Sequence, residues 1–140
     1  MTTGRIIATD ACVAEGADWL AARCPRMRGA LAEVGPLPLR RKPDGFAELL
    51  AAIVSQQVSV ASARAIWGRV AAAGLTSPEA IARASDDDLR ACGLSRPKMR
   101  YAQALAEARI DFDALRHAPD AQVIDTLTAV TGIGVWTAEI

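Results

Sequence analysis

Apolar residues recur at intervals of three and four along most of the chain, and this spacing restricts its fold more than any other feature. The strongest stripe is Phe46, Leu49, Leu50, Ile53 and Val54, which share one face of a helix expected to start at an Asp44 N-cap. No segment alternates apolar and polar residues long enough to form a strand. Because alanine supplies 30 of the 140 residues and aromatic residues only 4%, we expect an all-α protein of closely packed helices.

Capping patterns predict where several helices begin. Thr76 with Glu79, and Ser85 with Asp88, have the spacing of capping boxes. The second pattern places Asp86–Asp88 in a first helical turn, where the helix dipole favours negative charge. Three successive helical residues point in different directions, so this acidic run is better explained as a helix start than as a metal site.

Several classes of protein are excluded by composition. The longest uncharged stretch, Leu49 to Ala63, contains five serine and glutamine residues and falls short of the ~20 apolar residues of a membrane span. The N-terminus lacks the profile of a signal peptide, so we expect a cytoplasmic protein without a membrane partner. The three cysteines are widely spaced and His117 is the only histidine, which excludes a Cys/His zinc site built from this chain alone.

The length is that of one domain, and we expect residues 1–140 to form it. Residues 1–43 would supply N-terminal helices and a connector, and residues 120–140 a helix-hairpin-helix. The stretch from Gly35 to Gly45 has three prolines and three consecutive cations, so a domain boundary can also fall there.

The last segment is the most informative about function. A helical pattern runs into Gly132-Ile133-Gly134, and a second helix begins at once. Glycines allow backbone conformations and close approaches that other residues forbid, and the N–H groups that begin the second helix can bind a phosphate. Alone, the pattern fits equally well a glycine that ends a helix before a simple turn.

Three segments in order carry a family resemblance: IVSQQVS (Ile53–Ser59), CGLSRPKMRYA (Cys92–Ala102) and TGIGVWTAEI (Thr131–Ile140). From about Asp10 onward the chain resembles the helix-hairpin-helix (HhH-GPD) DNA glycosylases, most closely the 3-methyladenine DNA glycosylase II type. The resemblance implies two helical lobes flanking a cleft that holds a flipped nucleotide, the second lobe being incomplete in this chain. It also implies base-excision repair of damaged double-stranded DNA in the nucleoid, by a protein we expect to be a monomer.

The resemblance implies removal of alkylated purines by a monofunctional N-glycosylase. Trp136 matches the position that holds the nucleophilic lysine of bifunctional relatives, and a tryptophan cannot form a Schiff base. Its indole face would attract a cationic alkylated base, although a tryptophan in this place is as often a core residue. Gln56 and Gln57 would lie with Trp136 at the base pocket.

Further roles follow from the same resemblance. Arg96 is a candidate for the wedge that fills the gap left by the flipped base. The carbonyls of Thr128, Val130 and Ile133 would hold a monovalent cation, Na⁺ or K⁺, when DNA is bound, and no other cofactor or iron–sulfur cluster is expected. Thr131 replaces the usual proline before the first glycine and makes the loop less rigid. The residues expected to bind DNA are Gly132, Ile133, Gly134, Thr137, Arg96, Lys98 and Arg100.

The catalytic aspartate of the family lies one helix and a short loop beyond the hairpin, where it stabilises the cationic sugar. This chain stops at Ile140. We therefore expect that aspartate beyond Ile140, a truncated chain, and no base excision by these 140 residues alone.

Two other functions remain open. A non-catalytic helix-hairpin-helix module that tethers partners to DNA needs no aspartate, and a structural α-helical interaction domain needs no DNA. The net charge of zero does not exclude DNA, because residues 23–42 hold six cations and one acid.

Overall fold

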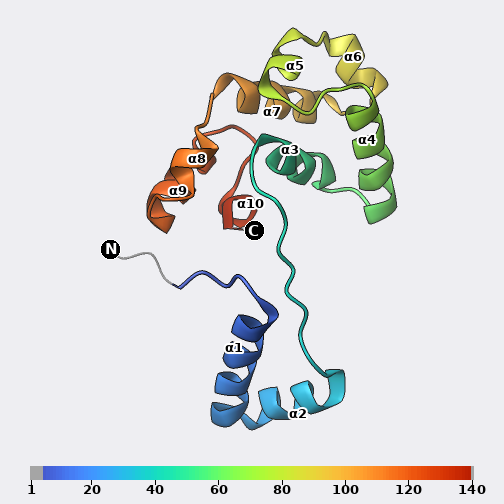
Figure 1. The fold of residues 1–140 in the computed structure, drawn as a ribbon. Coiled ribbons are helices and arrows are strands. Elements are labelled where there is room, and N and C mark those ends of the chain that lie inside the picture. The colour runs from blue at the N-terminus through green and yellow to red at the C-terminus, as the bar shows by residue number, and fades with distance from the viewer. Residues whose placement is uncertain (1–4, 140) are drawn as a thin grey trace. The chain divides into compact units, whose positions relative to one another are not determined.

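The computed structural model describes residues 5–139, and within them it contains helices and no strand, which confirms the all-α prediction (Figure 1). None of these helices is long and apolar enough to cross a membrane. The helices are α1 (Asp10–Arg23), α2 (Pro25–Val34), α3 (Phe46–Ser55), α4 (Val60–Ala72), α5 (Pro78–Arg83), α6 (Asp86–Ala91), α7 (Arg96–Glu107), α8 (Phe112–Leu115), α9 (Asp120–Thr128) and α10 (Val135–Glu139).

The chain forms two compact units, which divide between Lys42 and Pro43. The division falls inside the connector from Gly35 to Gly45, where no helix forms. Its prolines lack the N–H that a helix needs, which explains why the helical chain is interrupted there.

The first unit consists of α1, α2 and the connector. Thr9 caps α1 by accepting a hydrogen bond from the Cys12 N–H, and the Asp10 carboxylate accepts one from the Leu39 N–H at 3.1 Å. No side chain of α1 or α2 is buried. Its helices therefore have no buried core of their own, and the Leu39–Asp10 hydrogen bond links the connector to the start of α1.

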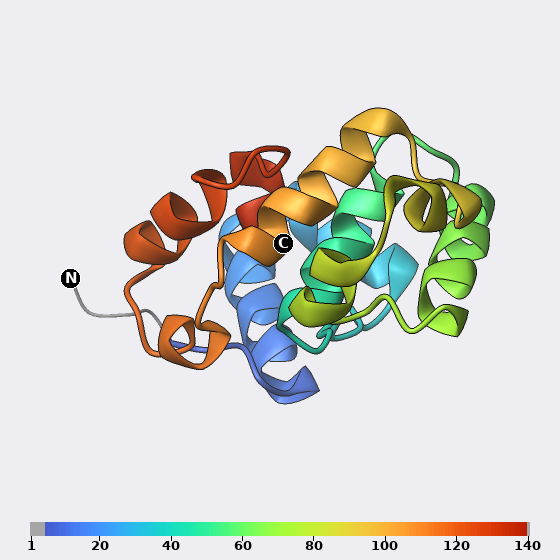
Figure 2. The ribbon, with the colours of Figure 1, turned by 90° about the horizontal axis from the view of Figure 1, so that it is seen from above.

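The second unit, α3 to α10, has its core around α3. Phe46, Leu50, Ile53 and Val54 are buried, as the apolar stripe predicts. α3 packs against α4 and α7, and α7 also packs along α5 (Figure 1 and Figure 2). Ile133 from the predicted hairpin is buried in the same core, so the second unit positions the hairpin.

The Ser85–Asp88 capping box is present at the start of α6. The Ser85 hydroxyl accepts from the Asp88 N–H at 3.2 Å, and the Asp88 carboxylate accepts from the Ser85 N–H at 2.9 Å. The capping box predicted at Thr76 is wrong, because Ser77 caps α5 by accepting from the Ala80 N–H.

The N-cap predicted at Asp44 is also wrong. Gly45, with φ of +107°, is the N-cap of α3. The Asp44 carboxylate accepts hydrogen bonds from the Arg116 guanidinium at 2.6 and 2.7 Å. The Asp44 carboxylate therefore takes part in a long-range ion pair instead of a local cap. Sequence spacing does not reveal this pair, because its residues lie far apart in the chain.

Candidate nucleic-acid interface

The loop between α9 and α10 is the centre of the candidate site. α9 ends at Thr128 and α10 begins at Val135, so only six residues separate the helices. The Ile133 N–H donates to the Val130 carbonyl at 3.1 Å, and the Ala138 N–H donates to the Gly134 carbonyl at 3.0 Å. The structure thus has the two helices and the tight glycine loop that the sequence predicts.

The two glycines of the loop have different surroundings. Gly132 has φ of +95°, and a Cβ placed on it would lie 2.2 Å from Cγ of Tyr101. Gly134 is exposed, and a Cβ placed there would have no neighbour within 4 Å. Gly132 is therefore needed for packing inside the protein, whereas Gly134 leaves open space through which another backbone can approach.

Tyr101 on α7 packs against the hairpin loop through Gly132. Sequence analysis did not link this residue with the hairpin. The contact with Gly132 joins residues far apart in the chain, so neither residue signals it alone.

Gln56 contacts the hairpin directly. Its Nε2 donates a hydrogen bond to the Gly132 carbonyl at 3.0 Å, in partly buried surroundings. The next residue, Gln57, is exposed and has φ of +55°. The two glutamines expected at the base pocket thus differ. The Gln56 amide is hydrogen-bonded to the loop, whereas Gln57 is exposed and has a backbone conformation that non-glycine residues rarely adopt.

Of the three α7 cations expected to bind DNA, Lys98 differs from the other two in its surroundings. Arg96 and Arg100 are exposed, but Lys98 is 8% exposed and its Nζ donates to the Val54 carbonyl at 2.6 Å. Burial lowers the pKa of Lys98 below its usual value. The helical repeat explains the difference, because it turns Lys98 and Met99 toward the core. Lys98 does not offer its ammonium to a phosphate in this structure.

Trp136 lies on the surface of α10. Its side chain is 77% exposed, so the interpretation of Trp136 as a core residue is wrong. Val135 beside it is also exposed, and Thr137 is half-buried. An exposed indole next to a loop that leaves room for a backbone is available for stacking on an aromatic ligand.

The three carbonyls expected to hold a cation have capacity for one. Within residues 5–139, no hydrogen bond outside the helices reaches the Thr128 or Ile133 carbonyl oxygen, while the Val130 oxygen accepts one from the Ile133 N–H. Oxygen atoms with unused lone pairs suit hard cations. These oxygens are thus of the chemical type that binds a monovalent cation, and the site itself stays a prediction.

No carboxylate of the hairpin has the surroundings of a catalytic acid. Asp120, Asp125 and Glu139 are exposed in α9 and α10. Asp111 caps α8, and Asp113 pairs with Arg116. Across the described residues, no group of His, Cys, Asp and Glu side chains could hold a metal ion either.

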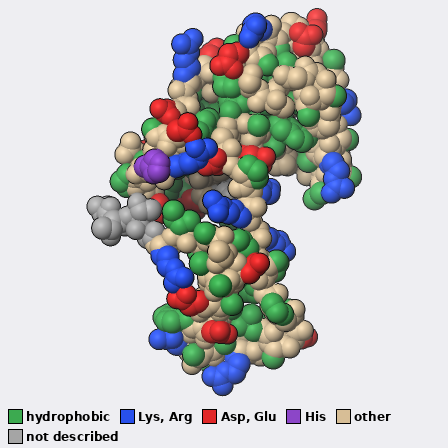
Figure 3. All heavy atoms as spheres, in the orientation of Figure 1, with side chains coloured by type: hydrophobic (Ala, Val, Ile, Leu, Met, Phe, Trp, Pro, Cys, Tyr) green, Lys and Arg blue, Asp and Glu red, His purple; other side chains and the backbone are tan. Residues whose placement is uncertain are grey.

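Charge is distributed in small groups on the face shown in Figure 3. In the unit formed by α3 to α10, Lys and Arg side chains lie near Asp and Glu at the edges of this face, with uncharged side chains between them. In the same unit, Arg116 pairs with both Asp44 and Asp113. The part of this face formed by α3 to α10 shows no continuous basic surface.

The sequence and the fold of this chain are similar to those of known DNA repair proteins. Residues 50–136 match the profile described as "HhH-GPD superfamily base excision DNA repair protein". The chain is 31% identical over 108 residues to DNA-3-methyladenine glycosylase 1 of Schizosaccharomyces pombe, an alignment that covers 71% of this chain and 47% of that protein. The chain thus spans about half the length of this curated relative.

Two solved structures have a similar fold over most of this chain. A DNA-3-methyladenine glycosidase from Bacillus halodurans superposes with a TM-score of 0.74 at 34% identity, over 99% of this chain and 64% of that chain. The S. pombe 3-methyladenine DNA glycosylase Mag1, in complex with abasic DNA, superposes with a TM-score of 0.77 at 27% identity, over 89% of this chain and 66% of that chain.

Proposed function

Because the chain belongs to the HhH-GPD superfamily of base excision DNA repair proteins, we propose that the whole protein is a monofunctional DNA N-glycosylase that removes alkylated purines of the 3-methyladenine type. The similar proteins from S. pombe and B. halodurans carry this activity in their names. These 140 residues would supply the DNA-binding part of that activity.

One arrangement carries the proposal: Gly132 is packed against Tyr101, Gly134 is open, and exposed Trp136 lies two residues after it. A loop fixed on its inner side and open on its outer side can bind a DNA backbone through its N–H groups without reading the sequence. The solved complex of the related Mag1 with abasic DNA supports this role. A sequence-independent grip suits an enzyme that must find damaged bases anywhere.

Trp136 would stack near the extruded base. Alkylation at a ring nitrogen gives a purine positive charge, and an indole face attracts a cation by about 0.5–2 kcal/mol. Because Trp136 stands where a Schiff-base lysine would be needed, the product would be an abasic site in an unbroken strand. The cost of extruding the base is lower for a damaged base that pairs weakly.

Two further groups complete the proposal. The carbonyls of Thr128, Val130 and Ile133 would hold a monovalent cation, which supplies positive charge to a DNA phosphate when bound. The carboxylate that stabilises the cationic sugar and orients water is not found among the described hairpin residues, and we place it beyond Ile140.

The test is release of methylated purine from alkylated duplex DNA. The 140-residue chain is compared with the chain extended through the next helix and loop of its gene, and released bases are separated by chromatography. We expect release by the extended form alone, with abasic strands left uncut until alkali is added. Equal release by the short form would contradict the placement of the carboxylate, and lesion-independent binding with no release by either form would contradict a glycosylase and favour a tethering module.

A further inference from the structure

Lys98 holds a charged group in a costly place. It is the third residue of α7, where the positive end of the helix dipole disfavours a cation, and it is buried. Its ammonium donates to the Val54 carbonyl at 2.6 Å. A buried lysine that opposes its own helix dipole needs such a partner in order to remain in the core.

The partner carbonyl belongs to the last turn of α3. Carbonyls of the last helical turn have no N–H donor inside the helix and commonly accept a hydrogen bond from a glycine-based cap. Here the chain leaves the helix through Gln56, whose N–H donates to the Ile53 carbonyl at 3.2 Å, and then through Gln57 with its positive φ. Lys98 donates to the carbonyl of Val54, which directly follows Ile53. A side chain of α7 therefore fixes the end of α3.

The end of α3 in turn contacts the hairpin. The Gln56 amide donates to the Gly132 carbonyl at 3.0 Å, while Tyr101, one turn after Lys98 on α7, packs against the Cα of the same glycine. α7 therefore supports the loop by two routes. Tyr101 contacts it directly, and Lys98 acts through α3 and Gln56.

We propose that Lys98 is a positioning residue for DNA binding: by holding the Val54 carbonyl it sets the Gln56 amide, which fixes the Gly132 peptide and so orients the loop of residues 132–134 toward a phosphate. The inference rests on the proposed function for the identity of the ligand. It differs from the expectation that Lys98 contacts phosphate itself.

The first measurement needs no DNA. Hydrogen exchange of the Ile133 and Ala138 amides, which donate to the Val130 and Gly134 carbonyls, is followed in Lys98→Met, in Gln56→Met and in the double variant. We expect exchange to speed up by about tenfold in each single variant and no further in the double variant, because both changes break one chain of contacts. Lys98→Arg keeps a charged donor and should restore part of the protection. Arg83→Met is the matched control, since Arg83 is exposed and its Nε also donates to a backbone carbonyl, that of Glu79 at 3.2 Å.

The second measurement uses a duplex with one tetrahydrofuran abasic-site analogue, titrated by fluorescence anisotropy. We expect Kd to rise by about 3- to 10-fold in Lys98→Met and Gln56→Met, with Arg83→Met close to the unsubstituted chain. The slope of log Kd against log salt should stay unchanged, whereas loss of a direct phosphate contact would lower it by about one.

The outcomes separate the two proposals. A folded Lys98→Met variant with unchanged Kd, additive effects in the double variant, or a lower salt slope would overturn the positioning role. Failure of the unsubstituted chain to bind the duplex would overturn the proposed function instead. Gln56→Met alters a partly buried amide outside the core, so it keeps the inference testable if Lys98→Met does not fold.

Discussion

The Tyr101 ring lies against Gly132 so closely that a Cβ on the glycine would fall 2.2 Å from the ring carbon Cγ. The same glycine has φ of +95° and gives its carbonyl to Gln56. Gly132 is thus held by Gln56 at the end of α3 and by Tyr101 of α7. These two contacts fix the position of the loop that follows.

Alanine should lower the free energy of unfolding at Gly132 and leave it nearly unchanged at Gly134. Gly132→Ala combines a positive φ with a clash against Tyr101, and we expect it to lower the free energy of unfolding by about 2–4 kcal/mol. Gly134→Ala meets no neighbour and should change it by less than about 0.5 kcal/mol. Urea denaturation followed by circular dichroism measures both. Equal losses in the two variants would contradict the assignment of Gly132 to packing and Gly134 to the open side.

Trp136→Ala should reduce function without reducing stability. The side chain is 77% exposed, so its loss should shift the free energy of unfolding by less than about 0.5 kcal/mol. Release of methylated purine by the whole protein should fall by about tenfold as the stacking contact disappears. Trp67 packs against the core, and Trp67→Ala should show the reverse pattern, with stability lowered by about 1–3 kcal/mol. A Trp136→Ala variant that unfolds easily would show that the indole is structural.

Acid should weaken α6 through its capping box. Hydrogen bonds from the Ser85 side chain and then its backbone hold the pKa of Asp88 below its usual value of 3.8. A carboxylate whose pKa is lowered by folding stabilises the folded state above its unfolded pKa, and this contribution is lost as the pH falls through the lower folded value. The stability difference between the unsubstituted chain and Asp88→Asn should therefore shrink below about pH 4. Asp125→Asn, on the exposed surface of α9, is the control; the same loss of difference there would point to general acid unfolding.

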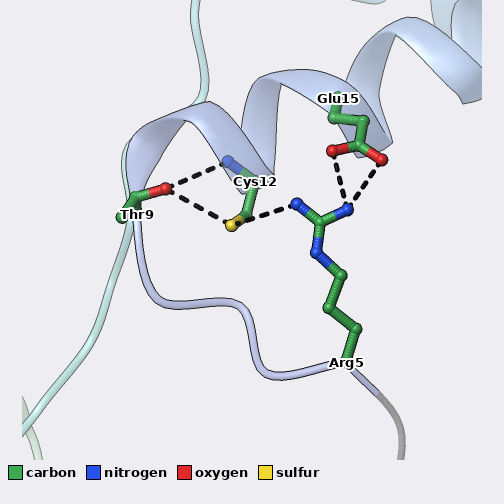
Figure 4. A network of polar contacts seen from close by, with 4 residues as sticks. All are labelled: Arg5, Thr9, Cys12 and Glu15. Atoms are coloured by element: carbon green, nitrogen blue, oxygen red, sulfur yellow. Dashed lines mark hydrogen bonds and ion pairs between the residues drawn. The ribbon is translucent and has the colours of Figure 1, made fainter.

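Cys12 should be the most reactive thiol near neutral pH. A hydrogen bond with the Thr9 side chain, then those with the Ala8 and Thr9 backbone, lower the pKa of Cys12 from 9.0 to about 7. Thr9 Oγ1 lies 3.3 Å from the sulfur, and Arg5 lies on its other side, bound to Glu15 (Figure 4). Iodoacetamide labelling read by mass spectrometry at pH 7 should modify Cys12 before buried Cys92. Thr9→Val should raise the pKa and slow the labelling, and an unchanged rate would exclude the hydroxyl as the cause.

Local patterns predicted the helices but not the contacts that organise the site. The apolar stripe of α3 and the Ser85 capping box depend on residues within a few positions of one another, so their spacing predicts them. The pairs Lys98 with Val54, Gln56 with Gly132, and Arg116 with Asp44 join distant parts of the chain. A lysine between two arginines resembles a surface cation in sequence, and only the packing of α7 against α3 shows that it is buried.

The most direct test of DNA binding by the Gly132–Gly134 loop is titration of the 140-residue chain with an abasic-analogue duplex at several salt concentrations, alongside Gly134→Val. We predict salt-sensitive binding, because the loop contacts phosphates, and a Kd about tenfold higher in Gly134→Val, because its side chain would fill the space left for the DNA backbone. A Kd that changes neither with salt nor with the substitution, or no binding at all, would contradict the assignment of the Gly132–Gly134 loop as the DNA-binding loop.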